Sequence, residues 1–431
     1  MTFRRHSKLK ASGHALLGDI PAAWTTSRVR YLTNIQKGRL PTTTYTEPQS
    51  DSDIPYLSME YLRGSDDVVC STYVSDDDSY VKANFDDILV LWDGSNAGEF
   101  LRAKKGVVSS TLAIIKEQTI DRDFLFFSLK SVEKQLKDQT IGMGIPHVSS
   151  ETLRDLTLCV PPLEEQSAIV YFLQQETAKI DALVAQQEKL IELLKEKRYV
   201  VISQATTKGI QPNVKTKESG VEWLGNVPEH WELLPLKRFF QLVVDVAPND
   251  NDFELLSLYT DIGVRPRKEL EARGNRASTT DGYFKVAKGD IVVNKLLAWM
   301  GAIGVSEYDG VTSPAYDILR AKRTLSPHYY DYLFRCGILN TEFRRYSRGI
   351  MDMRLRLYFE ELGQFQMPFP PYEEQLKIVK LLNEQLAHFD QLSDEAVKAI
   401  GLLQERRSAL ISAAVTGRID VRNTSANMEA A

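Results

Sequence analysis

The sequence predicts an α+β protein in which two diverged globular α/β domains are joined by two long helices. Three observations lead to this fold class. The chain contains an internal tandem repeat, the well-preserved part of each repeat has the apolar spacing of a coiled coil, and the diverged part has short β-rich runs between turn residues. If the helices pack antiparallel, they form a coiled coil and a pseudo-twofold axis relates the two halves.

The repeat is clearest when the chain is aligned with itself at an offset of 209 residues. Between Pro161 and Ile210, 22 of 50 positions are identical to their counterparts and no gap is needed. A second match relates 12-SGHALLGDIPAAW-24 to 219-SGVEWLGNVPEHW-231. The order is therefore A–B–A′–B′, with a domain at 1–160, a helix at 161–210, a domain at 211–369, a helix at 370–420 and a flexible tail at 421–431.

Each B segment is predicted to be one helix that begins after a Pro-Pro pair. Two acidic residues in the first turn of each helix interact favourably with the helix dipole. Gly417 is expected to end the second helix. Apolar residues spaced alternately by three and four predict a coiled-coil core. The predicted core residues are Ile169, Leu173, Ile180, Leu183, Leu190 and Leu194 in the first helix, and Ile378, Leu382, Phe389, Leu392, Leu403 and Leu410 in the second.

The A segments are expected to be α/β domains. The runs 87-DILVLW and 290-DIVVN predict strands among turn residues, and a helix is expected to follow in each domain. Asp123 is the expected cap of the first of these helices, and Pro327 the first helical residue of the second. Basic, glycine-containing loops follow both helices, at 140-TIGMGIPHVS and 347-SRGIMDMRLR.

Composition limits the possible classes of protein. The chain has 431 residues, 43% of them hydrophobic and 26% charged, and a net charge of −5, which is typical of a soluble globular protein. It has no run of roughly 18 apolar residues and no apolar segment after its basic N-terminus, so neither a membrane span nor a secretory signal is predicted. Three scattered cysteines and six dispersed histidines predict no disulfide and no metal site. A cytoplasmic, metal-free protein is expected.

The tetrapeptide Phe369-Pro370-Pro371-Tyr372 is close to the Asn-Pro-Pro-Tyr motif of enzymes that methylate exocyclic amines of DNA bases. In those enzymes the first side chain accepts a hydrogen bond from the amine, which neither Phe369 nor Val160 in the other copy can do. The sequence also has no phosphate loop and no glycine-rich strand–loop–helix segment for a nucleotide. The tetrapeptide is therefore interpreted as the start of a helix, and no catalytic residue is predicted.

Two unlike domains on a fixed spacer suit DNA. Duplex DNA has pseudo-twofold symmetry and repeats its major groove every ~34–36 Å, so such a protein fits two different half-sites at a set spacing. Basic side chains are the candidate contacts, since arginine reads guanine and also contacts phosphates, although each one alone is equally explained as a solvated charge. The candidates are Lys37, Arg39, Lys104, Lys105, Lys137 and His147 in the first domain, and Arg265, Arg267, Lys268, Arg273, Arg276, Arg344, Arg345, Arg348, Arg354 and Arg356 in the second.

These features resemble the specificity subunit of type I restriction–modification systems. The resemblance is carried by both Pro-Pro-x-Glu-Glu-Gln helix starts and by the Ser-Gly-x-x-x-Leu-Gly openings that begin at Ser12 and Ser219. It implies target-recognition domains from about Ser12 to Val160 and from about Ser219 to Pro368, joined by an antiparallel coiled coil whose length sets the gap between half-sites. It also implies two modification subunits that methylate adenine at N6 and two restriction subunits that translocate and cleave DNA. S-adenosylmethionine, ATP and Mg²⁺ would bind those partners, and this chain would bind no cofactor.

Other interpretations are compatible with the sequence. The chain could be a methyltransferase or a fused nuclease, which the missing cofactor and phosphate loops disfavour. It could be a structural coiled-coil adaptor, which does not explain why the A segments diverge while the B segments do not. It could also serve a related system whose partner fuses methylation and cleavage in one chain.

Overall fold

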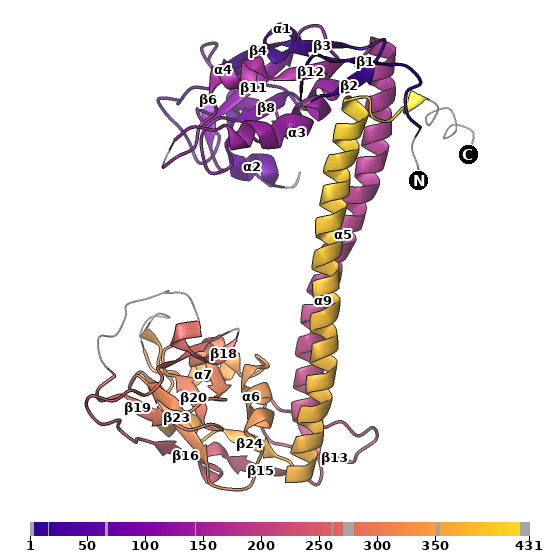
Figure 1. Ribbon diagram of the computed structural model, residues 1–431. Coiled ribbons are helices and arrows are strands. Elements are labelled where there is room, and N and C mark those ends of the chain that lie inside the picture. The colour runs from indigo at the N-terminus through magenta and orange to yellow at the C-terminus, as the bar shows by residue number, and fades with distance from the viewer. Residues whose placement is uncertain are drawn as a thin grey trace. The chain divides into compact units, whose positions relative to one another are not determined.

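The computed structural model describes residues 4–15, 17–64, 68–142, 144–260, 262–269, 280–349 and 354–422. The chain divides into two compact units, which we call unit 1 (Met1–Gln187 with Lys398–Ala431) and unit 2 (Glu188–Val397). Each unit contains one globular domain and a part of both long helices (Figure 1). Within the described ranges, no helix is both long and apolar enough to cross a membrane.

The core of the unit 1 domain is a four-stranded antiparallel sheet with the order β4-β11-β8-β9. Its strands are β4 (Thr33–Lys37), β8 (Ile88–Leu91), β9 (Phe100–Arg102) and β11 (Leu112–Glu117). All four side chains of β8 are buried, because this central strand is covered on both faces. A second sheet has the order β6-β5-β10-β7, in which β5 and β10 run parallel. It consists of β5 (Asp53–Leu57), β6 (Tyr73–Ser75), β7 (Lys82–Ala83) and β10 (Gly106–Val108).

The rest of the unit 1 domain connects these sheets to the long helices. Two further short pairs are β1 with β2 and β3 with β12, and β12 is the last strand before the first long helix. The elements are β1 (Leu9–Ala11), β2 (Asp19–Pro21), β3 (Thr25–Arg28), β12 (Thr157–Val160), α1 (Val29–Leu32), α2 (Met59–Arg63), α3 (Arg122–Asp138) and α4 (Ser150–Asp155). Helix α3 is capped by Asp121, whose carboxylate accepts the Phe124 N–H at 2.9 Å. The expected cap, Asp123, is wrong by two residues, since it lies inside the helix and pairs with Arg102 at 2.6 Å.

The unit 2 domain repeats this topology. Its central sheet has the order β16-β23-β20-β21, the same as in unit 1 when strands are matched in chain order. The sheet strands are β16 (Phe240–Val243), β20 (Ile291–Asn294), β21 (Ile303–Val305) and β23 (Tyr316–Ala321). Further strand pairs and bridges also match, among them β15 with β24 and the parallel bridge between Leu255 and Val311. These similarities show that the diverged A segments keep one architecture.

The remaining elements of unit 2 follow the same plan. The strands are β13 (Thr216–Glu218), β14 (Asn226–Pro228), β15 (Glu232–Pro235), β17 (Leu256–Tyr259), β18 (Gly263–Pro266), β19 (Phe284–Val286), β22 (Gly310–Thr312) and β24 (Gln366–Phe369). The helices are η1 (Leu236–Arg238), η2 (Arg267–Glu269), η3 (Ala298–Met300), α6 (Pro327–Arg335), α7 (Asn340–Tyr346) and α8 (Phe359–Leu362). As predicted, Pro327 is the first residue of its helix.

The two long helices are α5 (Leu163–Lys208) and α9 (Tyr372–Val415). Both begin directly after the Pro-Pro pairs, as predicted, and Gly417 adopts φ +70° after the end of α9. An added Cβ at Gly417 would lie 2.4 Å from a ring carbon of Pro21, so glycine is required there for two reasons. In unit 1, Leu410 and Ala414 of α9 share a buried cluster with Ile169 and Leu173 of α5. In unit 2, Ile202 of α5 shares a buried cluster with helix α9 residues Ile378 and Leu382.

The chain after α9 is partly packed. Val421 has only 2% of its surface exposed, and Arg422 forms ion pairs with Asp420 at 2.6 Å and Glu165 at 3.4 Å. The prediction that a flexible tail begins at residue 421 is therefore wrong for these two residues, because an apolar and a charged side chain both find partners on unit 1. Residues 423–431 lie outside the described part of the chain.

Candidate nucleic-acid interface

Four backbone segments meet at one end of the central sheet of unit 1. They follow the ends of β4, β8 and β10, and the fourth is the loop after α3. Backbone hydrogen bonds join them: Gly38 N–H donates to Leu112 O at 2.9 Å, and Val148 N–H donates to Trp92 O at 2.8 Å. We call this the unit 1 face; it comprises residues 37–40, 92–94, 109–111 and the described residues of 141–147.

Gly38 is a required residue of the unit 1 face. A Cβ at this position would lie 2.2 Å from the carbonyl oxygens of Val108 and Ser109, a distance that no side chain tolerates. The two loops can approach this closely only because residue 38 is glycine. Lys37 and Arg39 are both exposed on either side of it.

The loop after α3 is closed on itself by an antiparallel bridge. Ile141 N–H donates to His147 O at 3.0 Å, and His147 N–H donates to Ile141 O at 2.8 Å. We call residues 141–147 the first bridged loop. A further bridge joins His147 to Asp93, whose carboxylate pairs with the Lys37 ammonium at 2.8 Å. The structure thus brings together three of the predicted site residues, Lys37, Arg39 and His147.

The other candidates in unit 1 lie elsewhere or have partners. Lys104 and Lys105 follow β9, whose end pairs with the start of β8, so they belong to the opposite end of the sheet. The Lys104 ammonium donates to Gly64 O at 3.0 Å and lies 4.7 Å from the centre of the Tyr61 ring. Lys105 is exposed.

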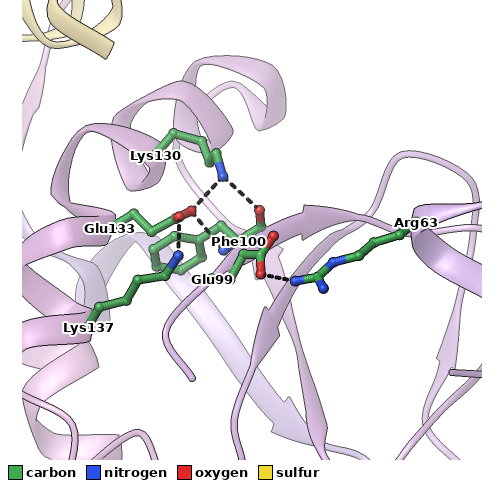
Figure 2. Close-up of polar contacts among 6 residues, drawn as sticks. All are labelled: Arg63, Glu99, Phe100, Lys130, Glu133 and Lys137. Atoms are coloured by element: carbon green, nitrogen blue, oxygen red, sulfur yellow. Dashed lines mark hydrogen bonds and ion pairs between the residues drawn. The ribbon is translucent and has the colours of Figure 1, made fainter. Parts of the chain in front are cut away.

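Lys137 is bound in the cluster drawn in Figure 2. Its ammonium pairs with Glu133 at 2.8 Å, and Glu133 also accepts hydrogen bonds from Lys130 at 2.5 Å and from the Phe100 N–H at 3.0 Å. Burial alone would raise the pKa of Glu133, but these hydrogen bonds outweigh burial and lower it. Arg63 and Glu99 pair beside this cluster (Figure 2). The Lys137 side chain therefore has a structural role, as the partner of Glu133 in an ion pair.

Unit 2 has an equivalent face built from different side chains. Leu357 N–H donates to Lys295 O at 2.9 Å, which matches the Val148–Trp92 hydrogen bond of unit 1. Arg348 and Arg356 exchange backbone hydrogen bonds of 2.8 and 2.9 Å, and we call 348–356 the second bridged loop, of which 350–353 lie outside the described residues. The unit 2 face comprises residues 295–300, 313–315, 344–346 and the described residues of 348–356.

Most arginine candidates of unit 2 gather on this face. Arg354 and Arg356 are exposed, and Arg348 pairs with Glu361 of α8. The Arg344 guanidinium lies 5.3 Å from the centre of the Trp299 ring, a cation–π distance. Arg345 lies 3.9 Å from Glu342. Five predicted site residues therefore come together around the second bridged loop.

Of the remaining candidates, Arg265 lies on β18, and Arg267 and Lys268 lie on η2. The Lys268 ammonium pairs with Glu254, and the Arg265 guanidinium donates to Val264 O at 3.0 Å. Burial raises the pKa of Tyr316, and the charge of nearby Arg267 opposes that shift, which puts Arg267 near the start of β23. Arg273 and Arg276 lie outside the described residues.

The glutamine of each Pro-Pro-x-Glu-Glu-Gln motif connects a long helix to its domain. In unit 1, Gln166 accepts the N–H of Asp121, the cap of α3, and donates to Pro161 O, both at 2.8 Å. In unit 2, Gln375 accepts the N–H of Ser326, which precedes α6, and donates to Pro370 O, again both at 2.8 Å. Both side chains are buried. The motif is thus a structural joint in both units, which we call the glutamine joint.

The acidic residue before each glutamine differs in its partners. Glu165 accepts the indole N–H of Trp24 at 2.7 Å, and Glu374 lies 2.7 Å from the imidazole Nε2 of His230. Carboxylates of Glu165 and Asp420 also lie near His6, so these residues form a potential metal-ligand cluster. Arg422 pairs with both carboxylates, however, and its guanidinium supplies the positive charge that balances them.

Ion pairs connect the two long helices at equivalent positions. Within unit 1, Arg407 pairs with Asp181 at 2.9 Å. Within unit 2, Arg198 pairs with Asp390 at 2.5 Å. The 209-residue offset of the repeat converts one pair into the other, because it relates Asp181 to Asp390 and Arg198 to Arg407.

The predicted core of α9 agrees with its burial, but that of α5 needs a correction. Leu183 and Leu190 are 45% and 39% exposed, while the adjacent Val184 and Ile191 are half-buried. The buried side of α5 continues through Gln187, which is half-buried, and through Leu194, which is buried as predicted. Two leucines predicted as core residues therefore lie on the outer side of the helix.

Sequence reasoning missed two components of these faces. The aromatic rings of Trp92 and Trp299 lie under Lys37 and Arg344, at 5.6 and 5.3 Å. The signal available was their position, since Trp92 directly follows a buried strand at the sheet edge where the loops meet. The exposed isoleucines of the first bridged loop carried no sequence signal at all.

Comparisons with known proteins agree with this architecture. Residues 21–193 match the family model described as type I restriction modification DNA specificity domain. The chain is 29% identical over 426 residues to the type I restriction enzyme MjaVIII specificity subunit of Methanocaldococcus jannaschii, covering 94% of this chain and 95% of that protein.

Solved structures show the same fold at low sequence identity. The crystal structure of an HsdS subunit from Thermoanaerobacter tengcongensis aligns with a TM-score of 0.52 at 15% identity, covering 92% of this chain and 98% of the other. A chain from a structure described as "Structural basis underlying complex assembly and conformational transition of the type I R-M system" aligns with a TM-score of 0.64 at 16% identity and the same coverage.

Proposed function

We propose that this chain is a type I restriction–modification DNA specificity subunit, and that it reads a bipartite and asymmetric DNA site with one half-site per globular domain. In this proposal it directs the N6 methylation of adenine, or cleavage, by partner subunits. The chemistry, with S-adenosylmethionine, ATP and Mg²⁺, belongs to those partners: two modification subunits and two restriction subunits.

The observation that carries the proposal is that one architecture presents two chemically different faces. Both units use the same strand ends and a bridged loop, as the matching hydrogen bonds Val148–Trp92 and Leu357–Lys295 indicate. The first bridged loop ends at His147, whereas the second ends at Arg356. A shared scaffold with different exposed side chains is what two unlike half-sites require, because base edges in the major groove are read by side chains.

The long helices are proposed to form an antiparallel coiled coil related by a pseudo-twofold axis. The supporting observation is that the 209-residue offset of the repeat relates the residues of the ion pair Asp181–Arg407 to those of the ion pair Asp390–Arg198. Helices of 46 and 44 residues extend about 66–69 Å at about 1.5 Å per residue. Such a spacer would set the gap between half-sites.

The outer side of these helices is the proposed docking surface for the modification subunits. Large apolar side chains there are exposed in the described chain: Leu183, Leu190, Leu193, Val397 and Leu402. Exposed leucines on a helix otherwise rich in charge mark a protein-interaction surface.

A map of N6-methyladenine tests the function. The chain would be co-expressed with its modification subunit in a host that lacks this methylation, and the methylated sites would be read across the genome. We expect a single motif with two short, unlike halves around a fixed, unspecified gap. A stable complex that methylates no DNA and shifts no duplex would contradict the proposal and favour a structural adaptor.

A further inference from the structure

The first bridged loop exposes two large apolar side chains. Ile141 is 55% exposed and Ile145 is 70% exposed, and neither packs into the cores of unit 1. Leaving them in water has a cost of about 25 cal/mol for every Å² of apolar surface that a partner could bury. Two exposed isoleucines in one short loop therefore indicate a contact that the free chain does not make.

The loop is rigid enough to present these side chains in a defined way. Gly142 has φ +124°, and a Cβ there would lie 2.6 Å from Ile145 O, so the backbone turns back on itself at close range. Pro146 restricts the preceding Ile145 to extended conformations, and its own carbonyl accepts the Gly94 N–H at 3.0 Å. The position of Ile145 is thus fixed by the loop and by the neighbouring strand end.

The surroundings of the loop identify the partner by its charge. Lys37, Arg39 and His147 are exposed beside the isoleucines, and Leu40 on the adjoining loop is 77% exposed. An apolar centre with basic side chains around it complements a surface that has methyl groups between phosphates. In duplex DNA that surface is the major groove at thymine, whose C5-methyl group is contacted by apolar side chains.

The second bridged loop provides the contrast. At its described positions it exposes Arg354 and Arg356 where the first loop has isoleucine and histidine. Arginine prefers the O6 and N7 atoms of guanine. Building on the proposed function, we propose that unit 1 reads its half-site through the C5-methyl groups of thymine, which Ile141 and Ile145 contact, while Arg39 binds a flanking phosphate.

The experiment removes single methyl groups from the DNA. The complex of the full chain with its modification subunit is titrated with duplexes in which each thymine of the motif is replaced in turn by deoxyuridine. We expect at least one replacement in the half-site of unit 1 to weaken binding by about fourfold, because one buried methyl group is worth about 0.8 kcal/mol and tenfold corresponds to about 1.4 kcal/mol. Replacements in the other half-site should have no such effect.

Protein variants connect the methyl group to the loop. In the Ile145→Ala complex, the same deoxyuridine replacement should cause no further loss, since the contact is already gone. Phe85→Ala is the matched control: Phe85 is 65% exposed but precedes β8 at the opposite end of the sheet, and this variant should keep the full sensitivity to deoxyuridine. A thermal unfolding curve that is the same for both variants and for the native chain excludes misfolding as the cause.

The outcomes separate this inference from the proposed function. If a bipartite motif exists but its first half-site contains no thymine, or none that is sensitive to loss of the methyl group, the inference is wrong and the function stands. If sensitivity persists in Ile145→Ala and also in Ile141→Ala, another residue reads the methyl group and the inference is also wrong. If no DNA motif exists at all, the function itself fails.

Discussion

Replacing Gln375 by leucine tests whether the glutamine joint fixes the second domain to its helix. The side chain is fully buried and makes two hydrogen bonds of 2.8 Å, to Ser326 N and Pro370 O. Leucine fills a similar volume but leaves both backbone groups without these partners. Each buried group that loses its hydrogen bond costs about 1–3 kcal/mol, so the two together cost roughly 2–6 kcal/mol.

The effect should be visible as a loss of thermal stability. For a unit of this size, about 1 kcal/mol changes the melting temperature by about 2–4 °C, so a loss near 3 kcal/mol lowers it by about 6–12 °C. Thermal unfolding of the full chain, followed by circular dichroism or calorimetry, measures this change. Urea unfolding gives the free energy itself.

The matched control is Gln404→Leu, an exposed glutamine on the same helix. Surface substitutions of this kind change the free energy of unfolding by less than about 0.5 kcal/mol. If Gln375→Leu is no more destabilising than Gln404→Leu, the glutamine joint is not a stabilising connection and our explanation of the motif is wrong. The corresponding variant of unit 1, Gln166→Leu, should behave like Gln375→Leu.

Three further predictions concern recognition, spacing and pH. If Arg354 reads a base, Arg354→Ala should weaken discrimination at one position of the second half-site by about 1–3 kcal/mol, measured by competition binding. The exposed Arg238→Ala variant is the control. An even loss of affinity on all sequences would instead mark a phosphate contact. Deleting residues 186–192 and 396–402 together shortens each helix by about 10 Å. The gap in the methylation motif should then be shorter by roughly 3 base pairs, with both half-sites unchanged. Altered half-sites would refute the idea that the helices set the gap. The pKa of Glu133 is lowered in the folded state, so Glu133→Gln should lower stability above pH 4.5, the ordinary pKa of glutamate. The difference in stability from the native chain should disappear as the pH falls below that value. A pH-independent difference in urea unfolding would contradict this.

The sequence predicted the elements that local chemistry specifies. The Pro-Pro pairs and their acidic residues mark both helix starts, and the buried strands β8 and β20 read as continuous apolar runs. The joint between helix and domain was not predictable, because it depends on a hydrogen bond between Gln166 and Asp121, which lie 45 residues apart. Nothing in the local sequence distinguishes this glutamine from a solvated one.

The error in the helix core has a physical origin. In α5, Leu183 and Leu190 form one possible stripe, and Val184 and Ile191 form another that is rotated by one residue. Alternating spacings of three and four counted from Ile180 select the leucines. The structure uses the other stripe, in which Arg198 pairs with Asp390 of α9. A polar residue in a seam is understandable only when its partner helix is known.

The sequence does not tell which of the charged candidates already have a partner. Lys37, Lys137 and Arg348 look alike in sequence to Arg354, yet the structure gives each of these three a carboxylate partner from its own unit. The partners are Asp93, Glu133 and Glu361 respectively. Only spatial neighbours reveal which basic residue is already paired. The positions of the two bridged loops at the sheet edge likewise depend on long-range backbone hydrogen bonds that no local pattern encodes.

The two repeats differ at the proposed DNA-binding faces and agree where each domain joins its helix. The glutamine joint has the same hydrogen bonds at the same distances in both units, while the bridged loops expose isoleucine in one and arginine in the other. Under the proposed function, a substitution in a bridged loop changes which base edges the domain contacts, and it is expected to leave the hydrogen bonds of Gln166 and Gln375 intact. Specificity can therefore change one half-site at a time without altering how either domain is attached to the spacer, provided that the face and the joint are energetically independent. Combining Ile145→Ala with Gln166→Leu tests that independence, since residues in separate networks give additive effects on stability.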